Sequence, residues 1–249
     1  MLNLTEKEKK FVSENPNAFI ICIEVKKTVI VHFATGENDV YTTKTEGEIF
    51  PAEHIGHFRK KLSKGRHLIA FEGKLTRIIL TDGESHSLLA VIQWGNIKWE
   101  SMERMFFACN EDFSLPKEVP DLSNVTNMGS MFRYAKSFNQ PLESWNVSNV
   151  TNMSDMFDDS ELFNQPLEKW NVSNVMNMGW MFCGAKSFNQ PLEKWNVSNV
   201  TNMSGMFMYA DSFNQPLEKW DVSNVTNMSC MFWYATSFNQ PLEKWNIKR

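Results

Sequence analysis

The chain has 249 residues, of which 42% are hydrophobic, and its formal net charge is −4. This length holds one large domain or two small ones, and the hydrophobic content is sufficient for a packed core. The negative charge and the lack of a basic patch argue against nucleic acid or an anionic membrane as the partner.

Neither disulfides nor membrane-spanning segments are predicted. The cysteines share no pairing pattern, which predicts free thiols. No apolar run reaches the ~18 residues that a transmembrane helix needs. Residues 1–16 lack the apolar core of a secretory signal, so we expect no signal peptide in the chain as given. The cysteines are Cys22, Cys109, Cys183 and Cys230.

Residues 1–16 are predicted to form a short helix at the surface. Thr5 is a suitable N-cap, and Glu8, three residues later, completes a capping box. Asn15-Pro16 is expected to end the helix, because the residue before proline disfavours helical backbone.

Residues 17–93 contain short runs rich in Ile and Val, separated by turn residues and with almost no helical periodicity. This pattern predicts short antiparallel strands packed as a small β-sandwich. The predicted strands are 19–25, 28–33, 40–43, 67–72, 77–81 and 88–94.

Residues 54–64 contain two short motifs that resemble signatures of a nucleotide-binding enzyme class. His54-Ile55-Gly56-His57 matches the phosphate-contacting signature of class I aminoacyl-tRNA synthetases, and Lys61-Leu62-Ser63-Lys64 resembles their second signature. In those enzymes a whole nucleotide-binding fold separates the two signatures, whereas here they are almost adjacent, so we reject that chemistry. A His-x-x-His pair without further ligands nearby is also a poor metal site. We predict a polar loop leading to the strand at His67.

From residue 94 onward the sequence repeats every 25 residues, after a degenerate first unit that steps 26 residues to the next. A fixed period in this range is typical of a solenoid, in which each repeat forms one turn and buries its apolar side against its neighbours. We predict about six turns, with a ladder of tryptophan rings inside the coil. These tryptophans are Trp145, Trp170, Trp195, Trp220 and Trp245.

Each repeat is predicted to contain one strand and one short helix. Leu142, Trp145 and Val147 follow the spacing of a leucine-rich-repeat strand, with Trp145 and Val147 pointing into the core. The apolar residues of 153–160 recur at i, i+3, i+4 and i+7, which is the spacing of one helix face.

The predicted fold class is therefore α+β, with a repeat architecture. Residues 1–16 form a helix or tail, and residues 17–93 form the β-sandwich. Residues 94–249 form a leucine-rich-repeat solenoid of parallel strands and short helices.

Asparagine and charged residues also recur in columns, one residue per turn. The amides are expected to satisfy backbone groups that tight turns leave unpaired. The Glu and Lys columns are expected to form a self-paired charge ladder, with contact to a partner that carries a matching repeat as the alternative. The amide columns are Asn149, Asn174, Asn199 and Asn224, and Asn139, Asn164, Asn189, Asn214 and Asn239; the charged columns are Glu168, Glu193, Glu218 and Glu243, and Lys169, Lys194, Lys219 and Lys244.

The repeat unit FNQPLEKWNVSNVTNM, residues 188–203, resembles the repeats of BspA-type leucine-rich-repeat surface proteins, which occur in many bacteria, including mycoplasmas. The resemblance covers 94–249. The segments 29–36 and 65–73 are similar to parts of the PKD-like β-sandwich found before such repeats. The resemblance implies a surface or secreted location and a role in adhesion and protein binding, although the chain as given shows no signal peptide, lipobox cysteine or anchor.

Differences between the near-identical repeats indicate a candidate binding surface. The columns that contain residues 155, 158 and 159 vary widely and are expected on the solvent side of the predicted helix. Random drift at a solvated face is the alternative, but drift usually leaves Lys, Glu and Ser, whereas exposed aromatic residues tend to mark interfaces. The candidate residues are Tyr134, Trp180, Met208, Tyr209, Trp233 and Tyr234.

These observations predict a non-enzymatic binding module. The expected partner is a protein, including a host or extracellular-matrix protein, with a glycan less favoured and no nucleic acid. No Ser-His-Asp arrangement or paired acid supports catalysis, and no cofactor is expected. The alternative is a structural module that self-associates through its last predicted strand, Leu242–Ile247, because that edge has no capping repeat.

Overall fold

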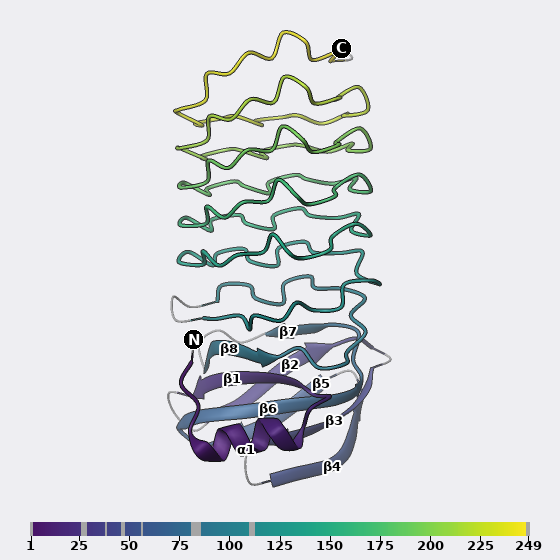
Figure 1. The fold of residues 1–249 in the computed structure, drawn as a ribbon, viewed down its shortest axis with the longest axis vertical. Helices are drawn as coiled ribbons and strands as arrows, with labels where there is room; N and C mark the ends of the chain where they lie inside the picture. The colour runs from purple at the N-terminus through teal and green to yellow at the C-terminus, as the bar shows by residue number, and fades with distance from the viewer. Residues whose placement is uncertain are drawn as a thin grey trace. The chain divides into compact units, whose positions relative to one another are not determined.

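The computed structural model describes residues 2–25, 29–37, 39–45, 48–55, 57–80, 86–109 and 113–247. The chain forms two compact units. The first consists of Met1–Glu100 and Asp112–Asp121, and the second of Ser101–Glu111 and Leu122–Arg249. Figure 1 shows that the first contains the labelled helix and strands, whereas the second is built from stacked turns of irregular backbone.

The helix α1 (Glu6–Glu14) starts and ends as predicted. The backbone N–H of Glu8 donates to the Thr5 hydroxyl at 3.2 Å, and the Thr5 N–H donates to the Glu8 carboxylate at 2.6 Å. This capping box pairs two N–H groups that the first turn of a helix otherwise leaves free. The helix stops at Asn15, before Pro16.

The described residues of the first unit form eight strands in two antiparallel sheets, which confirms the predicted antiparallel pairing. The larger sheet has the order β4-β3-β6-β1-β8, and the smaller has the order β5-β2-β7. The strands are β1 (Phe19–Val25), β2 (Val29–Thr35), β3 (Val40–Thr45), β4 (Glu48–Ile55), β5 (His57–Leu62), β6 (Gly65–Lys74), β7 (Ile78–Leu80) and β8 (His86–Gln93).

The central strand β1 carries much of the core of this unit, because it lies between β6 and β8. Ile20 and Cys22 pack with Leu68 of β6 on one face of the sheet, and Phe11 of α1 packs against that cluster. Phe19 lies in edge-to-face contact with Trp99, their ring centroids 4.9 Å apart. An Ile-rich strand is expected in such a doubly covered position.

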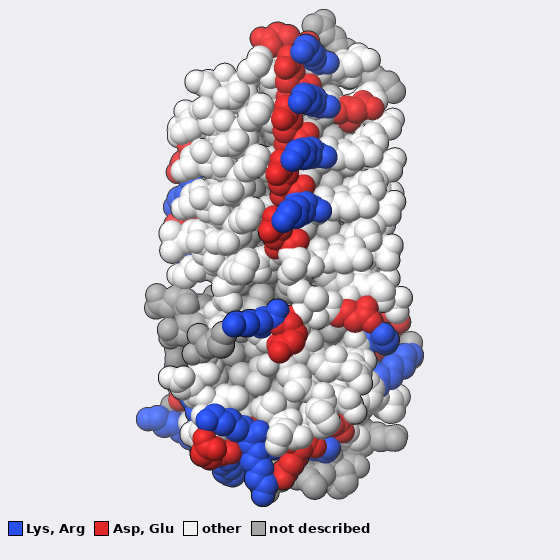
Figure 2. All heavy atoms as spheres, in the orientation of Figure 1, with Lys and Arg blue, Asp and Glu red and all other residues white. Residues whose placement is uncertain are grey.

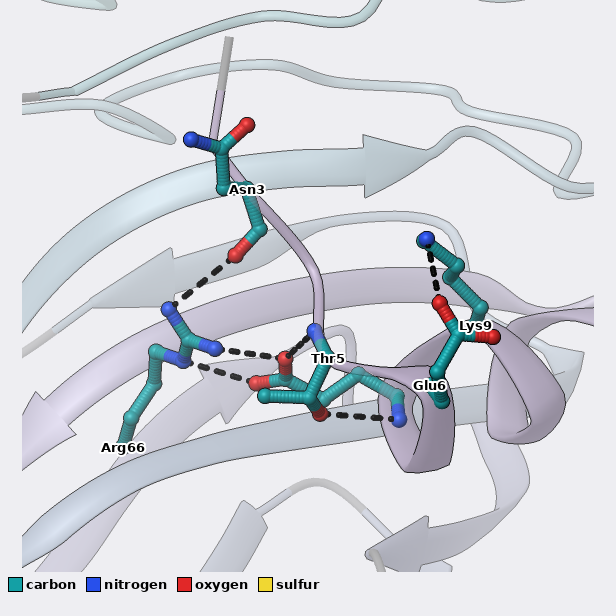
Figure 3. Close-up of polar contacts among 6 residues, drawn as sticks. Asn3, Thr5, Glu6, Lys9 and Arg66 are labelled. Carbon is teal, nitrogen blue, oxygen red and sulfur yellow. Dashed lines mark hydrogen bonds and ion pairs between the residues drawn. The ribbon is translucent and has the colours of Figure 1, made fainter.

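An ion pair fixes α1 to the sheet. From β6, Arg66 donates from Nε and Nη2 to the two Glu8 oxygens, at 2.7 Å and 2.5 Å (Figure 3). Burial by itself would raise the pKa of Glu8, but the hydrogen bonds from Thr5 and Arg66 outweigh it and lower the pKa. Glu8 thus completes the capping box of the predicted surface helix and also anchors that helix to the sheet.

The polar loop predicted before His67 is wrong, because β4 and β5 occupy this region. His54 lies in β4 and His57 in β5, while Gly56 between them is outside the described residues. β4 contains Pro51, which is tolerated because β4 is at the edge of its sheet. The motif is thus flanked by antiparallel strands, not by the helix start of the synthetase signature.

The second unit is a solenoid. One residue in each turn makes an isolated parallel β-bridge to the equivalent residue of the next turn. The predicted repeat stack and its period are confirmed. We name each turn by its bridging residue: the Ser101, Asn127, Asn152, Asn177, Asn202 and Asn227 turns.

The solenoid core consists of aromatic ladders, as predicted for the tryptophans. The rings of Trp195 and Trp220 are parallel, with centroids 6.5 Å apart. The Trp195 indole N–H donates to the Leu167 carbonyl of the preceding turn at 2.9 Å. Phenylalanines stack in the same way, as Phe157 does on Phe182 at 5.6 Å. These ladders bury a large apolar area in every turn.

The short helix predicted over 153–160 is wrong; these residues form turns. The N–H of Asp155 donates to the Gly179 carbonyl in the next turn, whereas the N–H of Asp158 donates three residues back, to Asp155. Asp155 and Asp159 also have left-handed backbone, with φ of 55° and 54°. An α-helix needs consecutive right-handed residues and i to i−4 hydrogen bonds, so this alternation excludes it.

The strand predicted over 142–147 is also wrong. The Trp145 N–H donates to the Leu142 carbonyl within its own turn, at 3.0 Å, so it does not pair with a neighbouring turn. Trp145 and Val147 are nevertheless both buried, as predicted. The bridges lie instead in an asparagine column that the sequence reasoning did not single out, as between Asn152 and Asn177.

The predicted role of the two other asparagine columns is confirmed. Asn174 donates from Nδ2 to the Ser148 carbonyl of the preceding turn, at 2.7 Å. The side-chain oxygen of Asn139 accepts from the Asn164 backbone N–H at 2.9 Å. These amides satisfy backbone groups that lack regular partners.

Candidate functional site

The three variable columns lie along one side of the solenoid, in the segment that contains the left-handed residues. Five of the six candidate residues have large exposed fractions: Tyr134 39%, Trp180 40%, Tyr209 38%, Trp233 51% and Tyr234 57%. We call this surface the variable face and define it by the three columns: Ser130, Asp155, Trp180, Gly205 and Cys230; Arg133, Asp158, Cys183, Met208 and Trp233; and Tyr134, Asp159, Gly184, Tyr209 and Tyr234.

Met208 differs from the prediction, because it is only 9% exposed. Two residues of the same column, Asp158 and Cys183, are exposed by only 4% and 6%. Neighbouring turns therefore cover this column over most of its length. Trp233 reaches solvent from the same column in the Asn227 turn.

The structure brings three of the predicted residues together. The rings of Tyr209 and Tyr234 stack with centroids 5.2 Å apart and an angle of 10° between their planes. Trp233 contacts both, at 5.6 Å from Tyr209 and 5.0 Å from Tyr234, and is tilted by about half a right angle to each. We call Tyr209, Trp233 and Tyr234 the aromatic triad. It exposes apolar ring surface on two adjacent turns.

Trp180 has a different environment on this face. A Cβ atom built on Gly205, the next residue in its column, would lie 3.0 Å from Cδ2 of the indole. The Trp180 ring thus occupies the space that Gly205 leaves. The large Trp180 side chain packs where Gly205 has none, so the variation at these two positions reflects packing between turns.

Tyr134 belongs to a second aromatic group, at the opposite end of the variable face. Its ring is 5.4 Å from Phe107 in an edge-to-face arrangement. Cζ of Arg133 lies 4.9 Å from the Tyr134 ring centroid, and Cζ of Arg104 lies 4.4 Å from that of Phe107. Each ring therefore has a guanidinium group of the chain itself over it.

Arg104 and Phe107 were missed by the sequence reasoning, although a signal was present. The 26-residue step aligns Arg104 with Ser130, and Phe107 with Arg133. Arg104 also shares the left-handed backbone of its column, with φ of 56°. The Ser101 turn thus extends the variable columns by one turn.

A charged cluster lies between the two aromatic groups. Nε of Arg133 is 2.8 Å from Oδ2 of Asp158, an ion-pair distance without hydrogen-bond alignment, and Nη1 is 3.3 Å from Oδ1 of Asp155. Burial raises the pKa of Asp158 to about 6, although the Arg133 charge and a hydrogen bond with Cys183 act in the opposite direction. Burial and the Asp158 carboxylate raise the pKa of the Cys183 thiol.

We expect the Asp158 carboxyl to reduce stability as the pH rises through about 6. Its pKa in the folded protein is above its ordinary value, so the folded state binds this proton more tightly. The stabilisation is complete below about pH 4 and is lost as the pH passes the folded pKa. As the pH rises from about 4 to about 7, the unfolding free energy of Asp158→Asn should increase relative to that of wild type by on the order of 2 kcal/mol.

Urea titrations at a series of pH values measure this difference. Asp211→Asn is the matched control, because Asp211 is an exposed carboxylate on the same unit. The control should show no such trend. If Asp158→Asn differs from wild type by the same amount at every pH, the prediction is wrong.

The charged columns form the self-paired ladder that was predicted. Each lysine contacts the glutamate of the preceding turn, as Lys194 does Glu168 at 3.1 Å and Lys219 does Glu193 at 3.1 Å. Figure 2 shows these side chains as adjacent blue and red columns. Exposed pairs of this kind contribute little stability individually, and their charges are already matched within the chain.

Within the part of the chain that the structure describes, no three His, Cys, Asp or Glu side chains are grouped so that they could hold a metal ion. Over the same residues, no helix has the length and apolarity needed to cross a membrane. Cys22, Cys109, Cys183 and Cys230 are all free thiols, as predicted, and Cys230 is exposed.

One family model matches the solenoid. Residues 100–198 and 167–249 match the family described as Mycoplasma protein of unknown function, DUF285. Together the two segments cover more than half of the chain. No curated protein and no solved structure matches it.

Proposed function

Because the chain belongs to the DUF285 family of Mycoplasma proteins of unknown function, we propose that it is a non-enzymatic protein-binding module. In this proposal, the partner binds the variable face of the solenoid. The repeats are of the leucine-rich type found in BspA-like surface proteins, and the first unit is a PKD-like sandwich. The module acts in adhesion at the cell surface or after secretion.

The aromatic triad is the observation that carries this proposal. Tyr209, Trp233 and Tyr234 leave between about two fifths and three fifths of their surface exposed. They also occupy columns that differ between repeats which are otherwise almost identical. Exposed, clustered aromatic rings are typical of the centres of protein interfaces. The charge ladder is a weaker candidate, because its charges pair within the chain.

Replacing all three triad residues by serine is expected to weaken partner binding at least about tenfold, because such anchors dominate interface energies. The partner is captured with the full chain, identified by mass spectrometry, purified, and its affinity measured by surface plasmon resonance. Lys169→Ser combined with Lys194→Ser is the control on the charge ladder and should bind normally. Unchanged binding by the triad variant would exclude this surface.

A second candidate function is self-association through the Asn227 turn. In the preceding turn, Gly205 and Phe207 donate their N–H groups to Ser229 and Met231. The equivalent N–H groups of Cys230 and Phe232 have no such acceptor within the described residues. An edge with unpaired donors can pair with another chain. Light scattering that shows a strict monomer at high concentration would reject this alternative.

A further inference from the structure

We propose that the aromatic triad binds arginine side chains on a basic surface of the partner protein. This inference rests on the proposed function and deepens it by naming the chemistry of the partner. It is based on how the same columns are occupied in other turns of the solenoid.

The first two turns show which group covers aromatic rings in these columns. In the Ser101 turn, the guanidinium of Arg104 lies 4.4 Å from the Phe107 ring centroid. In the Asn127 turn, the guanidinium of Arg133 lies 4.9 Å from that of Tyr134 and also donates to the Tyr134 hydroxyl at 3.2 Å. A planar guanidinium stacks well on an aromatic face, because its charge is weakly hydrated and attracted to the ring electrons.

The last two turns hold the rings without the cations. Gly205 and Cys230 occupy the column of Arg104, and Met208 and Trp233 occupy the column of Arg133. No guanidinium or ammonium group among the described residues lies over the triad rings. Trp233 and Tyr234, at 51% and 57%, are more exposed than Tyr134 at 39%, while Tyr209 at 38% is equally exposed. An arginine supplied by a partner would complete the arrangement that the chain itself makes at its first turns.

Titration of the full chain with three peptides tests this proposal. The probes are oligoarginine, oligolysine and oligocitrulline of equal length, because citrulline keeps the planar shape of arginine without its charge. Chemical-shift changes at the Trp233 indole N–H are expected to saturate with oligoarginine. Oligolysine should bind more weakly, and oligocitrulline should leave the signal unchanged. Equal binding of all three, or binding only of a neutral oligosaccharide added in a fourth titration, would overturn it.

The chain offers a sharper variant at Cys230. This position is equivalent to Arg104, with nearly the same backbone (φ 57° and 56°), so Cys230→Arg should place a guanidinium over Trp233 as Arg104 covers Phe107. We expect oligoarginine to bind this variant at least about tenfold more weakly than it binds wild type. Cys230→Ser is the matched control and should bind as wild type does. Unchanged binding by Cys230→Arg, in a variant whose circular dichroism is native, would contradict the proposal.

Different results would reject the arginine proposal and the proposed function. If the triad serine variant loses the natural partner but oligoarginine does not bind wild type, the arginine proposal is wrong and the proposed function stands. If oligoarginine binds through the triad but the natural partner is captured equally well by the triad variant, the arginine site exists and the proposed function is wrong.

Discussion

Replacing Trp195 by alanine is expected to lower the free energy of unfolding by about 3–5 kcal/mol. The indole is 3% exposed and lies in the middle of a ladder, parallel to Trp220 and tilted against Phe182. Its removal leaves a cavity that both neighbouring turns border. It also leaves the Leu167 carbonyl without the indole N–H that donates to it at 2.9 Å, which adds the cost of a buried, unpaired acceptor.

Trp195→Phe separates these two contributions. It keeps an aromatic ring in the ladder but removes the N–H donor, so we expect a smaller loss of roughly 1–3 kcal/mol. Urea unfolding followed by circular dichroism measures both variants. Because each turn contacts only its neighbours, the analysis should allow for partial unfolding of the array. A loss below about 1 kcal/mol for the alanine variant would show that the ladder is not a continuous core.

The stacked architecture could be predicted because stacking requires identical residues at identical positions. Once Trp145 and its equivalents recur every 25 residues, the rings must superpose from turn to turn, and the structure shows them parallel. The capping box of α1 was predictable for a similar reason, since Thr5 and Glu8 satisfy each other locally. Both features depend on few, short-range interactions.

The backbone within a turn could not be predicted from the same pattern. The apolar residues of 153–160 have helical spacing because the coil returns to its core with nearly the same period as a helix. The left-handed backbone at Asp155 and Asp159 distinguishes this coil from a helix. Most residues disfavour left-handed backbone by roughly 1–2 kcal/mol. Asp, Tyr or Trp at these positions therefore does not predict left-handed backbone. Gly184 and Gly205 lie in the same columns and were the sequence signal for left-handed backbone.

The candidate site was predictable in part. Variation between near copies located a side of the solenoid on which five of the six candidate residues are exposed, because core and ladder columns tolerate little change. It did not separate exposed from covered residues within that side. Met208 and Trp233 share a column, yet one is 9% and the other 51% exposed. The Asn227 turn follows Met208 and covers it, whereas no turn within the described residues follows Trp233.

Replacing Asn202 by alanine is expected to cost about 3 kcal/mol, because three hydrogen bonds are lost at roughly 1 kcal/mol each. Nδ2 of Asn202 donates to Oδ1 of Asn177 at 2.9 Å. Its Oδ1 accepts from the Ser204 backbone N–H at 3.0 Å and from the Ser204 hydroxyl at 2.8 Å. The residue also makes the parallel bridges that join its turn to both neighbours. The loss therefore weakens the connection between turns at the point where their backbones pair.

Asn199→Ala is the matched control, since it makes the same substitution three positions earlier in the chain. Asn199 is exposed, and Nδ2 donates to the Ser173 carbonyl at 2.7 Å. We expect this variant to lose about 1 kcal/mol or less. Urea unfolding of the two variants side by side measures the difference. Equal losses would mean that an asparagine contributes the same stability in either column. A larger loss for Asn202 would show that the bridging column holds successive turns in register.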